Sequence, residues 1–293
     1  MIGELAALAT ALLWSWTALF FTSAGRLVGS FPVNQNRLLF GAVLLFLTHF
    51  ILIGDYAVTD RGLYSLMASG IIGLVAGDLA LLKAFIILGA QRSMLIMALA
   101  PAFTSILAYF FLGEVIEEIA IVGIIITLAG IYWVLSEPRE KQAEIHGSMG
   151  KGIFLALLGA IFQAVGLVIA KYGLNDQMLD PLFATLIRMS AALFASLILM
   201  LARHQTREVL RSFQHKIALK YIMLGSIVGP FLGVWFSMIS IKHTQTGIGA
   251  TIMSTTPILI IPFSIIFHKE KPSWRSITGT LITVLGVAIL FWK

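Results

Sequence analysis

Long apolar runs, separated by short polar segments, follow one another from the first residues of the chain to the last. An α-helix needs about 20 apolar residues to cross the hydrocarbon core of a bilayer. Runs of this length lie at 4–23, 33–53, 64–88, 93–112, 117–135, 151–171, 181–202, 217–241, 246–267 and 274–292. They lack the alternation over about ten residues that barrel strands require. The pattern predicts an all-α integral membrane protein with ten transmembrane helices.

The two halves of the chain repeat the same pattern of proline, glutamate and glycine at an offset of 156 positions. The matching pairs are Gly73 and Gly229, Gly77 and Gly233, Pro101 and Pro257, Glu114 and Glu270, Gly123 and Gly279, and Gly130 and Gly286. We therefore expect a first five-helix repeat at 1–136, a polar linker at 137–150 and a second repeat at 151–293. Since five is an odd number, the second repeat enters the membrane in the opposite direction.

Composition agrees with a multi-pass protein of the cell membrane, because 59% of the residues are hydrophobic and only 12% are charged, against about 25% charged in soluble domains. The first run has no Lys/Arg-rich start or cleavage site, so it predicts a retained helix. The absence of cysteine excludes disulfides, thiolate metal ligands and a cysteine nucleophile. The net charge of +6 is interpreted as a signal of membrane orientation and not as a nucleic-acid surface.

The repeated motif, a proline followed after twelve residues by a glutamate and then by a glycine-spaced apolar helix, resembles the drug/metabolite transporter superfamily, specifically its ten-helix EamA-type members. The resemblance covers essentially the whole chain. It implies two inverted repeats that export a small organic molecule. Many members keep both termini in the cytoplasm, whereas Lys and Arg concentrate in the loops after odd-numbered runs and predict termini outside. The orientation stays open.

Asp78 is the most unusual polar residue, because it lies in the middle of the third run and its repeat counterpart is Val234. A charged aspartate at the bilayer centre costs about 2.5–3.5 kcal/mol. One hypothesis is that Asp78 exchanges protons during transport or pairs with a substrate cation. The alternative is a buried ion pair with a basic residue; the candidates are Lys83, Arg37, Arg188, Lys171 and Lys242. For Arg37 and Arg188 we expect a structural role, since basic side chains near helix ends reach the membrane interface.

Other mid-span polar and aromatic residues predict the wall of a substrate cavity. They are Trp14, Thr17, Gln163, Trp235, Ser254 and Thr255. A mostly apolar pocket with a few polar groups is typical of small-molecule sites. The alternatives are lipid-facing tryptophans, and hydroxyl groups that only satisfy the backbone near a proline.

Glycine and proline predict packing and breaks. The Gly-x-x-x-Gly spacing of Gly73 and Gly77, and of Gly229 and Gly233, allows helix backbones to approach closely. Pro101 and Pro257 each remove a backbone hydrogen bond, which predicts a kink, a hinge or a break that lines a cavity.

The function favoured by these features is a secondary transporter that exports a small metabolite, such as an amino acid or a related compound, by alternating access of the two repeats. The expected partners are this substrate, membrane lipid and protons; no cofactor or metal is expected, since His49, His243 and His268 are scattered. The alternatives are a lipid or polyprenyl-carrier flippase and a non-transporting membrane protein. An enzyme is disfavoured: Gly77-Asp78 is similar to the motif of intramembrane aspartyl proteases, but no second mid-span aspartate is present.

Overall fold

The computed structural model describes residues 1–52, 58–112, 118–136, 147–174, 179–244, 249, 252–268 and 272–290. Within these ranges all regular secondary structure is helical. Glu114, Glu270 and most of the predicted linker lie outside the described residues.

The helices follow the predicted runs closely. The first half contains α1 (Ile2–Val28), α2 (Ser30–Ile51), α3 (Asp60–Ser69), η1 (Gly70–Gly77), α4 (Asp78–Leu88), α5 (Ala90–Met97), α6 (Ala100–Leu112) and α7 (Glu118–Leu135). The second half contains α8 (Met149–Leu174), α9 (Pro181–Ala202), α10 (Thr206–Gln214), α11 (Lys216–Ser226), η3 (Ile227–Gly233), α12 (Val234–His243), α14 (Thr256–His268) and α15 (Trp274–Leu290).

Six helical stretches within the described ranges are long and apolar enough to cross a membrane. They are Ile2–Val28, Asp60–Leu88, Ala90–Phe111, Met149–Leu174, Pro181–Ala202 and Lys216–His243. Ile121–Leu135 and Trp274–Ile289 are shorter apolar helices. The chain is therefore a multi-pass membrane protein, while the count of ten spans stays a prediction.

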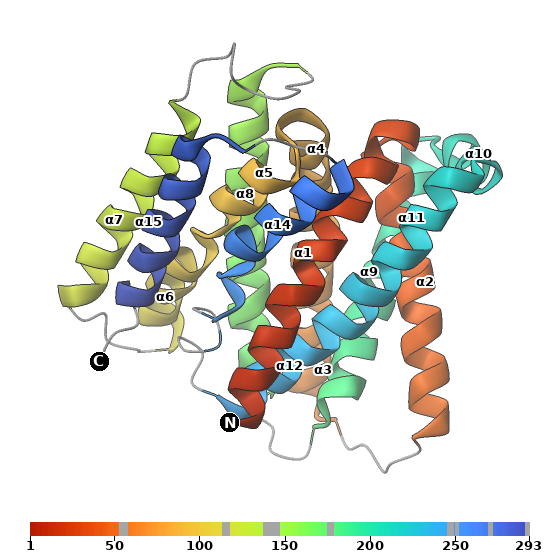
Figure 1. Cartoon of the computed structure of the whole chain (residues 1–293). Helices are drawn as coiled ribbons and strands as arrows, with labels where there is room; N and C mark the ends of the chain where they lie inside the picture. The colour runs from red at the N-terminus through yellow and green to blue at the C-terminus, as the bar shows by residue number, and fades with distance from the viewer. Residues whose placement is uncertain are drawn as a thin grey trace.

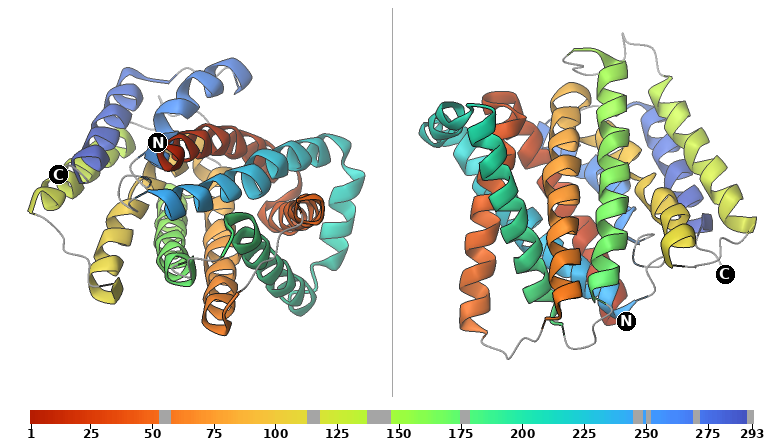
Figure 2. Two further views of the ribbon diagram at one scale, coloured as in Figure 1. Left: turned by 90° about the horizontal axis from the view of Figure 1, so that it is seen from below. Right: turned by 180° about the vertical axis from the view of Figure 1, so that it is seen from behind.

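The two halves pack across each other. Helix α1 packs against α11, η3 and α12, and α8 packs in the same way against α3, η1 and α4. Helix α2 lies beside α9, and α7 lies beside α15 at one side of the molecule (Figures 1 and 2). Each half thus provides the long helix that its partner half packs on.

The third run of each half is widened by a π-helix at an equivalent place. Segment η1 joins α3 to α4, and η3 joins α11 to α12, 156 positions later. Both contain the Gly-x-x-x-Gly spacing noted in the sequence. A π-helix inserts one extra residue into a helical turn and is found most often at functional sites.

The proline predictions need one correction of detail. The run at 93–112 was expected to be one helix, but α5 ends at Met97 and α6 begins at Ala100. Pro101 lies in the first turn of α6, and Pro257 lies in the first turn of α14. Backbone N–H groups in the first turn of a helix make no hydrogen bond within the helix, so a proline there removes none. The prolines therefore start helices after a break and do not kink a continuous one.

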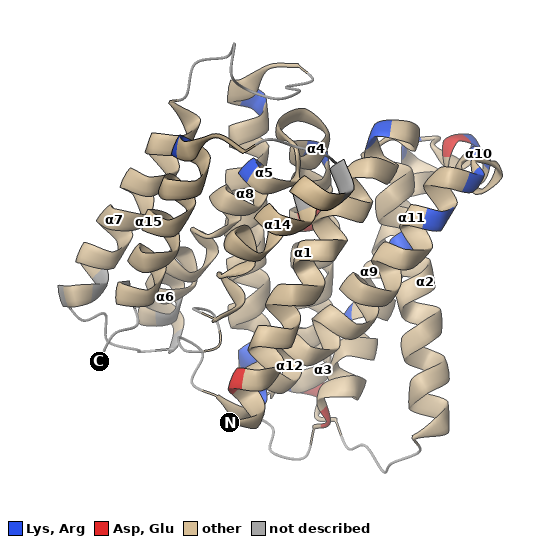
Figure 3. Cartoon of the chain, in the orientation of Figure 1, with Lys and Arg blue, Asp and Glu red and all other residues tan. Residues whose placement is uncertain are grey.

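Charged residues gather at one end of the molecule. Most Lys and Arg positions lie at the end that carries α10, whereas the start of α1 and the end of α15 lie at the opposite end (Figure 3). The positive-inside rule then places the α10 end in the cytoplasm and the termini outside. This placement remains a prediction.

Gly70→Ala should destabilise the protein, because a Cβ at Gly70 would collide with the backbone carbonyl of Arg188. We expect the free energy of unfolding to fall by about 1–3 kcal/mol, as measured by denaturant unfolding in detergent. Gly150→Ala is the matched control, since a Cβ at exposed Gly150 would meet only the Ser148 hydroxyl oxygen, at a relaxed distance of 4.0 Å. Equal stability of the two variants would contradict the packing of η1 on α9.

Candidate functional site

A cavity of about 140 Å³, the central cavity, lies between the two halves. Its wall includes residues of α1, η1, α4, α5 and α6 from the first half, and of α8, η3, α12 and α14 from the second. Most of these residues are apolar, among them Phe21, Phe85, Met94 and Met97. The polar liners are Thr17, Arg37, Asp78, Thr104, Gln163, Ser254 and Thr256. This composition is typical of a small-molecule site.

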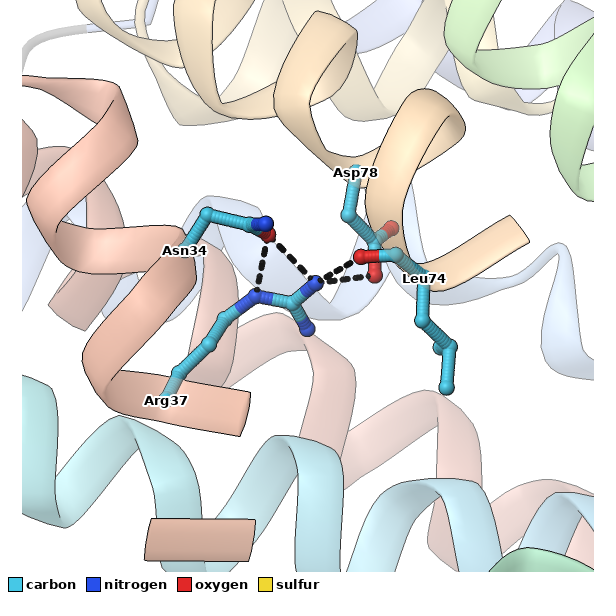
Figure 4. Close-up of polar contacts among 4 residues, drawn as sticks. All are labelled: Asn34, Arg37, Leu74 and Asp78. Carbon is cyan, nitrogen blue, oxygen red and sulfur yellow. Dashed lines mark hydrogen bonds and ion pairs between the residues drawn. The ribbon is translucent and has the colours of Figure 1, made fainter. Parts of the chain in front are cut away.

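One wall of the central cavity holds an ion pair between α2 and α4. The Nη2 atom of Arg37 lies 2.7 Å from Oδ2 of Asp78 (Figure 4). Both side chains are largely buried, with exposed fractions of 5% and 19%. The guanidinium also donates to Oδ1 of Asn34, from Nε at 3.0 Å and from Nη2 at 2.7 Å. Asn34 precedes Arg37 by three positions, which places both on one face of α2.

The π-helix supplies the remaining acceptor for Arg37. In an α-helix the N–H of Asp78 would bond to the carbonyl of Leu74, four residues earlier. Here that N–H is directed at the carbonyls of Gly73 and Val75. The Leu74 carbonyl instead accepts from Nη2 of Arg37 at 2.7 Å (Figure 4). The extra residue of η1 therefore frees the backbone oxygen that helps to hold the arginine.

Arg188 of α9 is the second buried guanidinium of this region, with 3% of the residue exposed. Its Nη1 contacts the sulfur of Met238 at 3.2 Å, and its Nε is buried without a hydrogen-bond partner. A Cβ placed on Gly73 would lie 3.7 Å from Nη2 of Arg188 and 3.6 Å from Oε1 of Gln163. Oε1 of Gln163 is also buried and unpaired. We call Asn34, Arg37, Asp78, Gln163 and Arg188 the polar cluster.

The polar cluster corrects our view of the two arginines. Arg37 and Arg188 do not extend out of the bundle but are buried inside it. Each is the eighth residue of its helix, about 10 Å along the axis from its start. Of the proposed partners of Asp78, Arg37 is the one that pairs, whereas Lys83 is exposed. The buried ion pair is therefore present, and it leaves the proton hypothesis untested.

The structure brings most of the predicted cavity residues together. Those that line the central cavity are Trp14, Thr17, Asp78, Pro101, Gln163, Gly229, Ser254 and Pro257. Trp235 and Thr255 do not line it. The Trp235 ring packs against the rings of Phe231 and Phe236, and the Thr255 hydroxyl donates to the Ile252 carbonyl at 2.7 Å.

The glycines lie where helices of different halves meet. A Cβ on Gly77 would lie 3.2 Å from Cβ of Phe162, and a Cβ on Gly233 would lie 2.8 Å from Nε1 of Trp14. Gly229 faces Thr17 in the same way. The absence of side chains at these positions is what lets α1 approach η3 and α8 approach η1.

Several residues that line the central cavity were not predicted from the sequence. The spacing of Asn34 and Arg37 on one helical face was the signal for the buried arginine. Thr256, noted in the sequence only as part of the hydroxyl-bearing run before Pro257, also lines the cavity. Its carbonyl accepts from the Ser15 hydroxyl at 3.3 Å, which ties α14 to α1. Met94, Met97 and Thr104 are indistinguishable in sequence from ordinary apolar-helix residues.

Comparison with known proteins identifies the fold and a family. A sequence model of the EamA-like transporter family matches residues 1–136 and 150–292. A protein of Archaeoglobus fulgidus described as an uncharacterized transporter is 21% identical over 297 residues, which cover 99% of this chain and 98% of that protein. A solved crystal structure superposes with a TM-score of 0.70 at 17% identity, covering 99% of this chain and 96% of the other. This likeness shows a shared fold.

The ion pair predicts a non-additive pattern of stability. Arg37→Met should lower the free energy of unfolding by about 3–5 kcal/mol, because it leaves the Asp78 carboxylate buried without its cation. The double variant Arg37→Met/Asp78→Leu should recover most of that loss, since it removes both charges. Unfolding in detergent measures both, with Lys83→Met on the exposed face of α4 as control. A double variant no more stable than Arg37→Met would contradict the pairing.

Proposed function

The chain belongs to the EamA-like transporter family, and from that membership we propose that it is a secondary transporter that exports a small organic metabolite by alternating access. The observation that carries the proposal is the central cavity, which both halves of the chain line. An amino acid or a related compound is the substrate class that we propose on the basis of the family resemblance.

The moving parts in this proposal are the halves 1–136 and 151–293, related as inverted repeats of five transmembrane helices each. Helix α1 of the first half packs on α11, η3 and α12 of the second half, and α8 of the second half packs on α3, η1 and α4 of the first. This reciprocal packing supports the relation. The π-helices η1 and η3 at equivalent positions support it as well. Rocking of the halves about a fixed central site is the common mechanism of such folds.

The size of the central cavity favours a small substrate over a flippase. Its volume of about 140 Å³ is close to that of an engineered cavity that holds one benzene molecule. A polyprenyl carrier is far longer than such a cavity. Lipid flipping is therefore the function to test next only if no metabolite is transported.

The coupling of transport to protons through Asp78 remains a proposal. Its carboxylate already accepts from Arg37, so a proton would have to compete with a guanidinium. Substrate exchange, and transport of the substrate down its own gradient, require no proton at Asp78.

Blocking the cavity should abolish export. Thr104→Phe adds a ring to a cavity-lining position on α6, and we expect cells that overexpress it to lose the metabolite accumulation seen in the medium with the wild type. Ile125→Phe adds the same ring to α7 at a side chain that is 60% exposed, and it should export normally. Metabolite profiling at equal membrane abundance makes the comparison. Equal accumulation with both variants would mean that the cavity is not the route.

Alternating access predicts that a cavity residue is reachable from both sides of the membrane in turn. Because the chain has no cysteine, Met97→Cys at the cavity wall can be labelled without background. We expect a membrane-impermeant maleimide to label it from either side in oriented vesicles. Ser136→Cys, at an exposed position after α7, should react from one side only. Labelling of Met97→Cys from a single side under all conditions would contradict alternating access.

A further inference from the structure

The polar cluster carries more positive than negative charge. Arg37 and Asp78 line the cavity, and the guanidinium of Arg188 lies behind them, next to Gly73 and Gln163. These two guanidinium groups and one carboxylate are the charged groups of the polar cluster. Arg37 is satisfied by Asn34, Leu74 and Asp78. With all three groups ionised, the cluster has a net charge of +1 inside the bundle.

The surplus charge is that of Arg188. A guanidinium has five N–H donors, yet the described contact of Arg188 is a thioether, which is a weak acceptor. Its Nε is buried with no hydrogen-bond partner. The Asp78 carboxylate attracts Arg188 but is bonded to Arg37, so Arg188 has no carboxylate in direct contact among the described residues. A buried cation without such a contact is destabilising. A ligand that supplied a carboxylate at this point would relieve that cost.

Gln163 connects Arg188 to the central cavity. It lines the cavity, and its unpaired Oε1 lies beside Gly73 together with Nη2 of Arg188. Gly73 has no side chain to fill the space between the two groups. A small rotation of the Gln163 side chain would therefore open a path from the cavity to the guanidinium, and its amide N–H would supply a second donor for a bound anion.

Resting on the transport function proposed above, we propose that the substrate is a small organic monoanion with an apolar body. Its carboxylate binds between Arg188 and Gln163, and its body lies against Trp14, Phe85 and Met97. The single negative charge of such a substrate would bring the net charge of the polar cluster to zero. Among the amino acids and related compounds proposed above, those without an ammonium group fit best, because an ammonium group would need a free carboxylate and the Asp78 carboxylate is engaged by Arg37.

Three probes of one shape and different charge test this selectivity. Benzoate, benzyl alcohol and benzylamine match the size of the cavity and its aromatic wall. On the purified full-length protein at neutral pH, ligand-induced shifts of the unfolding midpoint give their affinities. We expect benzoate to bind at least about tenfold more tightly than benzyl alcohol, which is about 1.4 kcal/mol, and benzylamine to bind most weakly. Benzoate binding no tighter than benzyl alcohol on the wild type would overturn the proposal without recourse to any variant.

Variants then assign the selectivity to Arg188. Arg188→Gln should lose the preference for benzoate and keep its affinity for benzyl alcohol, whereas Arg188→Lys, which keeps the charge, should retain most of the preference. Arg203→Gln removes an exposed arginine just after α9 and should behave as the wild type. An undiminished preference in Arg188→Gln would overturn the assignment.

Flux measurements separate this inference from the transport function. In proteoliposomes, selective benzoate binding by a protein that moves no probe would contradict transport and leave the anion site standing. Faster flux of benzylamine than of benzoate would contradict the anion site and leave transport standing.

Discussion

Arg37 and Asp78 meet inside a helical bundle, where neither charge would be stable without the other. Their contact, at 2.7 Å, joins α2 to α4 at the wall of the central cavity. It depends on a local departure from α-helical geometry, because η1 directs the Asp78 N–H away from Leu74 and leaves the Leu74 carbonyl for the arginine. Backbone polar groups in a membrane protein need internal partners, so the widened turn and the ion pair stabilise each other.

The two halves of the chain share their architecture but not their chemistry. Segments η1 and η3 occupy equivalent positions, yet α4 begins with Asp78 whereas α12 begins with Val234. Tight glycine contacts are found in both halves, at Gly77 and at Gly233. The repeated features thus build the helix crossings around the cavity, and the features that differ supply the charge at one wall of it. An asymmetric polar cluster inside the proposed repeat architecture would suit the transporter proposed above, which moves as two halves and binds one substrate between them.

The sequence predicted the fold well because membrane insertion imposes strong patterns. Helix α9 begins and ends at the predicted residues, and the Gly-x-x-x-Gly spacings fall in η1 and η3, where a Cβ on Gly77 or Gly233 would lie within 3.2 Å of another helix. The π-helices themselves could not be predicted, since their extra residue leaves no mark on hydropathy. The burial of Arg37 and Arg188 was missed because both residues lie near the start of a helix, and such positions were expected to be close to water. Whether an arginine near a helix end is buried depends on which residues of other helices it contacts, and a single sequence does not show those contacts.

The cavity beside the polar cluster is the substrate site in the function proposed above. An experimental structure of the protein with 4-bromobenzoate tests it most directly, because the anomalous signal of bromine locates the ligand independently of the protein density. We expect a bromine peak inside the cavity near Met97, with the carboxylate directed toward Gln163 and Arg188. Bromine peaks only on the lipid-facing surface, with none in the cavity, would contradict it.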